Sequence, residues 1–272
     1  MDFEQQVDLA RHPITDPESP AAVELLDRCR SGLRDRGAYV LEGFLRQDAV
    51  GTILNELDGV LAHAFYKPKK HNPYLAPTDE NLAPSHPRNR EQLTNSATLA
   101  YDFIGNDGLL ERLYRWPPLR AFVAKTLGYD ELYPYEDALA AVNVLVYPPG
   151  TQTGWHLDNA HFVVTLMLQQ GQGGGSYEYA PFIRTPDEDN YPAIEAVLDG
   201  DSGPVHTLHQ GAGDLVVFQG RYTLHRVTEV QGSAPRIIAV LSYDAKPGTT
   251  LTPHTRTTFY GRAEAGDPLP RQ

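Results

Sequence analysis

Two histidines and an aspartate have the residue types and spacing of an iron-binding set. His156 and Asp158 are two residues apart, and His225 follows well downstream. Two imidazoles and one carboxylate are the ligands of a facial triad, which holds Fe(II) and leaves three coordination positions open. Arg236 begins the run RIIAVLSY, where an inward-facing arginine needs an anionic partner. Together the four residues indicate an O₂-dependent oxygenase with an anionic co-substrate.

A His-x-Asp pair is weak evidence by itself. The chain contains 10 histidines, and roughly one such pair is expected by chance. On an extended backbone, however, residues i and i+2 project to the same face. His156 and Asp158 follow the segment 150–155 at the expected end of a strand, where they can supply adjacent corners of an octahedron.

His206 and His209 are alternative third ligands. His209 is followed by Arg221, much as His225 is followed by Arg236. The residues after His209 are typical of a loop. Arg236, in contrast, begins an apparent strand on which Arg236, Ile238, Val240 and Ser242 share the inward face. We therefore favour His225 and Arg236.

The chain divides into a helical first part and a second part rich in short strands. Residues 67–95 are polar and rich in proline, which is typical of a solvated loop, a lid or a binding loop. Many short strands bounded by Gly, Pro and Asp predict a sandwich or barrel, so the expected fold class is mainly β with N-terminal helices. We expect helices over 20–36, 47–64, 108–115, 118–127 and 193–198, and strands over 37–41, 141–147, 162–168, 176–179, 214–218, 221–230 and 236–243.

Length and composition favour one domain over residues 1–272, with a mostly helical layer over 1–130 and a β core over 134–262. The net charge of −12 argues against nucleic acid or an anionic membrane as the main partner. Cys29 is the only cysteine, which excludes an intrachain disulfide and a thiolate metal site. Without a signal pattern or a long apolar run, we expect a cytoplasmic protein; its oligomeric state stays open, a homo-oligomer included.

The four residues predict a particular co-substrate. A 2-oxo acid chelates iron through its 1-carboxylate and keto oxygen, and arginine suits the far carboxylate through two parallel hydrogen bonds. O₂ takes the remaining position, and oxidative decarboxylation then releases succinate and CO₂ while a substrate C–H bond is hydroxylated. Desaturation and oxidative ring closure use the same iron chemistry and stay open. A non-catalytic jelly-roll binding module is the alternative from another class.

Five segments carry a resemblance to a known family: GWHLDNAHFVVTLMLQ, GGGSYEYAPFIR, GDLVVFQGRYTLHRVTEV, PRIIAVLSYD and FYGR. They resemble the Fe(II)/2-oxoglutarate-dependent oxygenases and look most like the group of free-amino-acid (lysine-type) halogenases and hydroxylases. The resemblance covers roughly residues 37–262 and implies a double-stranded β-helix, or jelly roll. It also implies that His156, Asp158 and His225 bind iron and that Arg236 binds 2-oxoglutarate.

The same resemblance separates hydroxylation from halogenation. The halogenases of this group have glycine at the position of Asp158, which leaves room for halide on the iron. With Asp158 present, the resemblance implies a hydroxylase acting on a small free amino acid or a close derivative.

Residues around the substrate are predicted less directly. By resemblance, Arg88 grips the carboxylate of the amino acid. Phe259 and Tyr260 fall where the lysine enzymes carry a tryptophan pair that closes over the substrate. Asn159 falls where an acidic residue would hold a lysine ammonium group, which argues against lysine as the substrate, and Ser242 ends the inward face that Arg236 begins.

Four polar residues complete the set of candidates. Asn143 and Thr165 either face the co-substrate or are ordinary polar residues of their strands. Glu136 and Asp137 either bind an ammonium group or are solvated loop residues.

Overall fold

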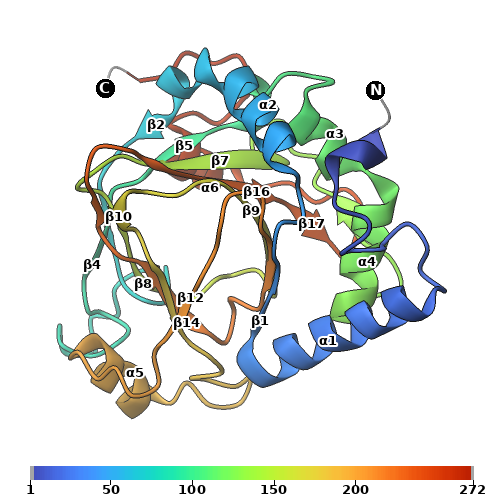
Figure 1. Ribbon diagram of the computed structural model, residues 1–272. Helices are drawn as coiled ribbons and strands as arrows, with labels where there is room; N and C mark the ends of the chain where they lie inside the picture. The colour runs from blue at the N-terminus through green and yellow to red at the C-terminus, as the bar shows by residue number, and fades with distance from the viewer. Residues whose placement is uncertain (1–2, 271–272) are drawn as a thin grey trace.

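Two antiparallel sheets form the body of the molecule (Figure 1), described over residues 3–270 by a computed structural model. The seven-stranded sheet has the order β1, β13, β9, β16, β7, β5, β2. The six-stranded sheet has the order β12, β11, β14, β8, β4, β3. This pairing of non-consecutive strands confirms the predicted jelly roll.

The strands are short, and their bounds are as follows. The seven-stranded sheet comprises β1 (Ala38–Leu41), β13 (Leu215–Phe218), β9 (Val163–Gln169), β16 (Arg236–Leu241), β7 (Val142–Tyr147), β5 (Ala97–Leu99) and β2 (Phe65–Tyr66). The six-stranded sheet comprises β12 (His206–Leu208), β11 (Tyr177–Ala180), β14 (Leu224–Val227), β8 (Thr153–His156), β4 (Gln92–Thr94) and β3 (Lys69–His71). Two small pairs are β10 (Gly173–Gly174) with β15 (Val230–Gln231), and β6 (Tyr133–Pro134) with β17 (Tyr243–Asp244).

Four of the α-helices, α1 to α4, cover the outer face of the seven-stranded sheet. The α-helices are α1 (Pro20–Arg36), α2 (Gln47–Asp58), α3 (Leu109–Arg115), α4 (Pro117–Leu127), α5 (Tyr191–Leu198) and α6 (Pro253–Tyr260), and 3₁₀ turns span Phe3–Gln6, Leu61–His63 and Tyr101–Phe103. α1 begins where the Ser19 side chain accepts a hydrogen bond from the Ala22 N–H, and it ends at Gly37 with φ of 70°. The largest apolar cluster joins α1–α4 to alternate strand residues such as Val142 and Val144. No helix within residues 3–270 is both long and apolar enough to cross a membrane.

The opposite face of β7, β16 and β9 lines the interior between the sheets. Residues directly opposite one another on neighbouring strands share a face, and Arg236 on β16 pairs with Tyr147 on β7. Val240 pairs with Asn143 on one side and Thr165 on the other. Tyr147 also belongs to an apolar cluster with residues of the six-stranded sheet. This row is therefore the inward face.

The segment 67–95 differs from the expected loop. β3 and β4, at its two ends, pair with each other and add two strands to the six-stranded sheet. The first 130 residues thus supply strands to both sheets as well as helices. Strands of two or three residues are too short to show alternation, and α6 begins at a proline in a polar stretch, so the sequence pattern reveals neither.

Asp137 ties the interior strands to α6. This carboxylate is buried and accepts hydrogen bonds from the backbone N–H groups of Leu139, Ala140 and Leu251. The Arg256 guanidinium on α6 lies 3.0 Å from it. The contacts of Asp137 are therefore structural. Of the two acidic candidates, only Glu136 is exposed.

Replacing Asp137 tests this structural role. Asp137→Ala removes the acceptor of three backbone N–H groups and leaves the half-buried Arg256 with only the exposed Glu264, so we expect the free energy of unfolding to fall by about 3 kcal/mol. Glu136→Ala is the matched control and should change it by less than about 0.5 kcal/mol. Urea denaturation of both variants measures the difference, and equal stabilities would contradict the role assigned to Asp137.

Candidate active site

His156, Asp158 and His225 lie together between the two sheets. β8 and β14 are neighbours, and His156 is directly opposite His225. Asp158 follows the end of β8, and its Oδ1 lies 3.6 Å from His156 Nε2 and 3.5 Å from His225 Nε2. Within residues 3–270, these three are the one group of His, Cys, Asp and Glu side chains arranged to hold a metal ion.

Both imidazoles are oriented by the backbone. His156 Nδ1 lies 2.9 Å from the Gly154 carbonyl oxygen, and His225 Nδ1 lies 2.9 Å from the Thr223 carbonyl oxygen. Since a carbonyl only accepts hydrogen bonds, each Nδ1 carries the proton and donates it. Each Nε2 therefore presents a lone pair toward Asp158, as metal ligation by histidine requires.

The charge state of the cluster also suits a cation. Burial lowers the pKa of His156 to about 3, with a further decrease from His225, so this imidazole is neutral at neutral pH. Burial raises the pKa of Asp158, but the two imidazoles lower it by more, and the net shift is downward. An ionised carboxylate beside a neutral imidazole is the state that a divalent metal binds, and the set of two nitrogens and one oxygen suits Fe(II).

Gly220 makes room for the carboxylate of Asp158. Its carbonyl accepts a hydrogen bond of 3.1 Å from the Asp158 N–H. A Cβ added at position 220 would overlap the Asp158 carboxylate. A glycine after a strand reads as an ordinary turn, so the sequence pattern gives no sign of this contact.

The alternative histidines lie elsewhere. His206 is exposed on β12, where its ring contacts Tyr179, and His209 is exposed in the loop that follows. Neither belongs to the metal-binding group. The structure thus brings together the three residues that the strand pattern favoured.

Arg236 is a buried cation with no acidic partner. It is 2% exposed, and its Nη2 donates a 3.2 Å hydrogen bond to Gln210 Oε1 while its guanidinium lies 5.3 Å from the Tyr147 ring. No carboxylate within residues 3–270 forms an ion pair with it, and burial lowers its pKa. A buried guanidinium of this kind is stabilised by a bound anion, which fits the far carboxylate of 2-oxoglutarate.

Tyr177 connects the metal ligands with Arg236. Its ring stacks on that of His225, with centroids 5.6 Å apart, and meets Phe218 edge to face. Burial raises the pKa of its hydroxyl well above the usual value; Asp158 raises it further, and Arg236 lowers it. The phenol therefore stays protonated between the two sites. Sequence reasoning missed Tyr177 and Gln210, although the alternation on β11 places Tyr177 on the same face as Tyr179.

Two predicted polar residues lie on the interior face beyond Arg236. Asn143 and Thr165 flank Val240 in the row described above, and all three are half-buried. Asn143 Nδ2 donates a 3.4 Å hydrogen bond to the hydroxyl of Tyr260, which is buried on α6. Phe259, its neighbour, is 43% exposed. The structure therefore places Asn143, Thr165 and Tyr260 along one interior wall.

Arg88 is held by side chains on and just before α5. Its Nε donates a 2.8 Å hydrogen bond to the Tyr191 hydroxyl on α5, its Nη2 lies 3.7 Å from Asp189, and its guanidinium covers the Tyr74 ring. Tyr74 belongs to the apolar cluster that joins α5 to the outer side of β8 and β14. Arg88 thus shares the carboxylate of Asp189 with Arg184, and its role in substrate binding stays a prediction.

Asn159 and Ser242 make mainly backbone contacts. The Asn159 side chain is exposed, and its carbonyl accepts a hydrogen bond from Arg221. Ser242 lies just after β16, where its carbonyl accepts hydrogen bonds from the Tyr114 hydroxyl and the Tyr135 N–H. β16 ends at Leu241, and the Ser242 N–H donates a further 3.0 Å hydrogen bond to the Ala141 carbonyl. The substrate roles of both residues stay predictions.

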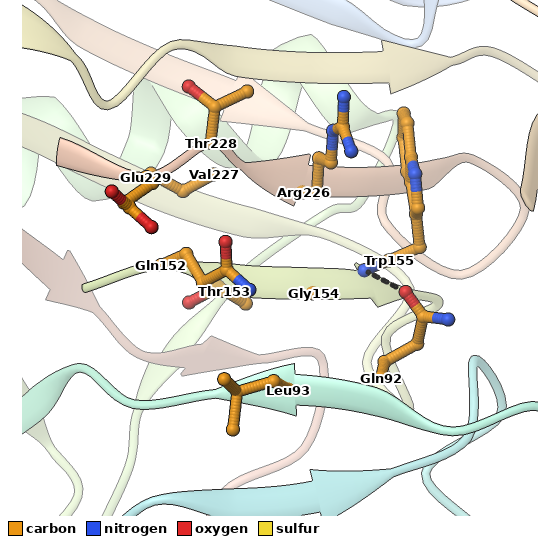
Figure 2. A pocket seen from close by; sticks show the side chains of 10 residues that line it. All are labelled: Gln92, Leu93, Gln152, Thr153, Gly154, Trp155, Arg226, Val227, Thr228 and Glu229. Carbon is orange, nitrogen blue, oxygen red and sulfur yellow. Dashed lines mark hydrogen bonds between the residues drawn. The ribbon is translucent and has the colours of Figure 1, made fainter. Parts of the chain in front are cut away.

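A surface hollow lies over the six-stranded sheet, on the face turned away from the iron ligands. Figure 2 shows Arg226 beside the Trp155 ring, and Gln92 accepting a hydrogen bond from the Trp155 N–H. Arg226 points away from the metal ligands, because successive strand residues project to opposite faces and its neighbour His225 points inward. It pairs with Glu178 at 2.7 Å. This hollow is therefore separate from the metal site.

Residues 22–259 match the family model of Halogenase D. The chain belongs to the Halogenase D family. A search with the sequence found no matching protein among those with curated functions. The family and the triad together make this protein a member of the Fe(II)/2-oxoglutarate-dependent oxygenases.

Solved structures share the fold of this Halogenase D family member at low sequence identity. The non-heme alpha ketoglutarate dependent epimerase SnoN from nogalamycin biosynthesis matches with a TM-score of 0.57 and 18% identity over 81% of each chain. The carbocyclase SnoK from the same biosynthesis matches with 0.57 and 16% over 90% of this chain and 93% of its own. AviO1 from Streptomyces viridochromogenes matches with 0.57 and 17% over 82% of this chain and 96% of its own.

The contact between Gly220 and Asp158 generates a prediction about iron binding. In Gly220→Ala the added methyl group displaces the carboxylate, and we expect Fe(II) affinity to fall about 10- to 100-fold, as when other supporting residues of metal ligands are changed. Gly51→Ala is the control, because a Cβ there meets open space. Anaerobic competition with a chromogenic chelator measures the affinities; equal values for both variants would show that Asp158 does not bind iron.

The unpaired guanidinium generates a second prediction. Arg236→Lys keeps the charge but loses the paired hydrogen bonds, so the KM for 2-oxoglutarate should rise about tenfold. Arg226→Lys changes an outward-facing arginine of the same barrel and should leave that KM unaltered. Succinate formation at varied 2-oxoglutarate gives both values. A KM for Arg236→Lys equal to that of the control would remove Arg236 from the co-substrate site.

Proposed function

We propose that the protein is a hydroxylase that converts an unactivated C–H bond of a small free amino acid, or a close derivative, into C–OH. The reaction consumes O₂ and 2-oxoglutarate and releases succinate and CO₂. One observation carries the proposal, namely the carboxylate of Asp158 placed within 3.6 Å of both ligand nitrogens. It completes the three-ligand set and leaves three positions of an octahedral iron for 2-oxoglutarate and O₂.

The residues of the site would hold the iron and 2-oxoglutarate, orient the two imidazoles and shield the metal ligands from water. Bound iron, with 2-oxoglutarate and O₂, supplies the oxidant that attacks the C–H bond. His156, Asp158 and His225 would hold the iron, and the backbone carbonyls behind the imidazoles fix their orientation. Arg236 would hold the far carboxylate of 2-oxoglutarate. The apolar ring of Phe218 and the protonated phenol of Tyr177 shield the ligands from water.

Halogenation is the second candidate, and the family's name favours it. Transfer of a halogen requires halide on the iron, and the halogenases that the sequence resembles have glycine at the position of Asp158. Here Asp158 is ionised and directed at the metal-binding nitrogens. It would take the coordination position that a halide needs on bound iron, which supports oxygen transfer over halogen transfer.

Desaturation and oxidative cyclisation use the same residues and differ only in how the substrate lies over the iron. The row of Asn143, Thr165 and Tyr260 supports a small polar substrate beside the iron ligands. A non-catalytic module is disfavoured, because it would have no use for three intact ligands and a buried unpaired arginine.

Product mass tests the proposal. The wild-type protein, loaded anaerobically with Fe(II) and supplied with 2-oxoglutarate, O₂, chloride and a panel of L-amino acids, should yield a product heavier than its substrate by one oxygen atom. Asp158→Ala and His225→Ala should lose at least about 99% of substrate-dependent succinate formation, since each removes a metal ligand. A chlorinated product, or one lighter by two hydrogens, would replace hydroxylation with the corresponding alternative. Unchanged succinate formation by both variants would end the assignment.

A further inference from the structure

A row of ring-bearing side chains crosses the inner face of the six-stranded sheet, from the metal ligands to the edge of the sheet. β8, β14, β11 and β12 are successive strands there, and β12 is the edge strand. His156 is directly opposite His225. Tyr179 is directly opposite His225 on one side and His206 on the other. Because residues opposite one another on neighbouring strands share a face, the row joins the iron-binding position to His206, which is exposed.

Two oxidisable rings, those of Tyr177 and Tyr179, lie along this row. Tyr177 precedes Tyr179 by two residues on β11, so both side chains project to the same face. The centroid of the Tyr177 ring lies 5.6 Å from that of His225 and 6.4 Å from that of Tyr179. The Tyr179 ring in turn lies 5.7 Å from the ring of His206. These contacts form a continuous path from an iron ligand to an exposed side chain.

Phe218 packs against this path without being able to carry oxidation itself. Its ring meets the rings of Tyr177, Tyr179 and His225 edge to face, and it is 3% exposed. Edge-to-face contacts of this kind hold aromatic rings in place. A phenol loses one electron and one proton far more readily than a phenyl ring or a neutral imidazole loses an electron. Along this path, therefore, the two tyrosines are the residues that can be oxidised.

Activation of O₂ in the absence of substrate leaves an oxidant with no C–H bond to attack. Oxidative decarboxylation of 2-oxoglutarate places one oxygen atom of O₂ in succinate, and the other normally enters the substrate. Reduction of that second oxygen atom to water takes two electrons and two protons. Two phenols can supply them, since each loses one electron and one proton and becomes a neutral tyrosyl radical. An enediol such as ascorbate then returns two electrons and two protons to the tyrosines and becomes dehydroascorbate.

We propose that Tyr177 and Tyr179 form a relay that carries oxidising equivalents from the iron site to the surface when O₂ is activated without a substrate. Tyr177 is oxidised first, because its ring contacts that of the ligand His225. Tyr179 then restores Tyr177 by giving it an electron and a proton, and the radical ends beside the exposed ring of His206. The relay uses iron, 2-oxoglutarate and O₂ but is independent of the substrate and of the product formed from it.

Trp155 is the rival exit from the iron site. It precedes His156 on β8, and its ring lies on the outer face of the sheet, where the Arg226 guanidinium is 4.6 Å from the ring centre (Figure 2). One-electron oxidation of an indole leaves a positive charge on the ring, and the neighbouring guanidinium opposes that charge. The two tyrosines lose their protons on oxidation and become neutral, so the inner path is favoured.

The test follows oxidation without any substrate. Protein loaded anaerobically with Fe(II) and 2-oxoglutarate is mixed with O₂, with and without ascorbate, and frozen at increasing times. EPR spectroscopy detects radicals, and a narrower signal from protein labelled with ring-deuterated tyrosine identifies them as tyrosyl. The variants are Tyr177→Phe, Tyr179→Phe, Trp155→Phe and, as control, Tyr133→Phe on β6, whose hydroxyl donates to Glu131. The visible absorbance of the anaerobic complex shows whether each variant binds both Fe(II) and 2-oxoglutarate.

The wild type and Tyr133→Phe should show a transient tyrosyl signal that ascorbate removes. Tyr177→Phe should lose the signal, and the masses of its peptides should show oxygen atoms added near the iron site earlier than in the control. Tyr179→Phe should keep the signal for longer and resist ascorbate, because the radical is trapped on Tyr177.

Three results would overturn the relay: an unchanged signal in Tyr177→Phe, a signal lost only in Trp155→Phe, or no trapped signal in Tyr179→Phe. The last of these decides by itself if Tyr177→Phe fails to bind Fe(II) and 2-oxoglutarate. The mass of the product formed from a substrate is a separate measurement, so the proposed function stands or fails independently of these results.

Discussion

The cross-strand pairing of His156 with His225 is the constraint on which the site depends. It sets two imidazoles side by side on neighbouring strands, and the turn after β8 brings the carboxylate of Asp158 against both. Three polar side chains packed this closely in a buried place are stabilised when a cation binds among them. The surrounding structure supports this cluster: two backbone carbonyls fix the ring tautomers, Gly220 leaves space for the carboxylate, and Tyr177 and Phe218 shield His225.

Cationic side chains without a carboxylate partner lie between the sheets near the metal ligands. Arg236 is buried without a carboxylate, and Lys69 lies half-buried against an aromatic ring without one. By contrast, Arg256 is paired with Asp137, and Arg88 and Arg184 share the carboxylate of Asp189. Arg236 lies on the seven-stranded sheet and Lys69 on the six-stranded sheet, and the reaction that we propose requires two carboxylate-bearing molecules. One carboxylate belongs to 2-oxoglutarate and the other to the amino acid.

Much of the catalytic centre follows from the sequence because strand alternation is a local rule. The His-x-Asp pair at a strand end predicts metal ligands that the structure brings together with His225, and the arginine that begins an inward-facing strand predicts a co-substrate site. Residues such as Gly220, Gln210 and Tyr177 escape this reasoning, since their roles depend on contacts between segments far apart in the chain. The contacts of Arg88 with Asp189 and Tyr191 escape it for the same reason, while its substrate role, given by the resemblance, stays a prediction. β3, β4 and α6 were missed because elements this short, or this polar, carry no periodic pattern.

A crystal structure of the anaerobic complex with Fe(II), 2-oxoglutarate and chloride is the most direct test of the account's central claim, which is that Asp158 occupies an iron coordination position. We predict an anomalous iron peak bound by His156 Nε2, His225 Nε2 and an Asp158 carboxylate oxygen, with the far carboxylate of 2-oxoglutarate on Arg236. Iron bound by the two histidines with chloride in place of a displaced Asp158 would contradict it.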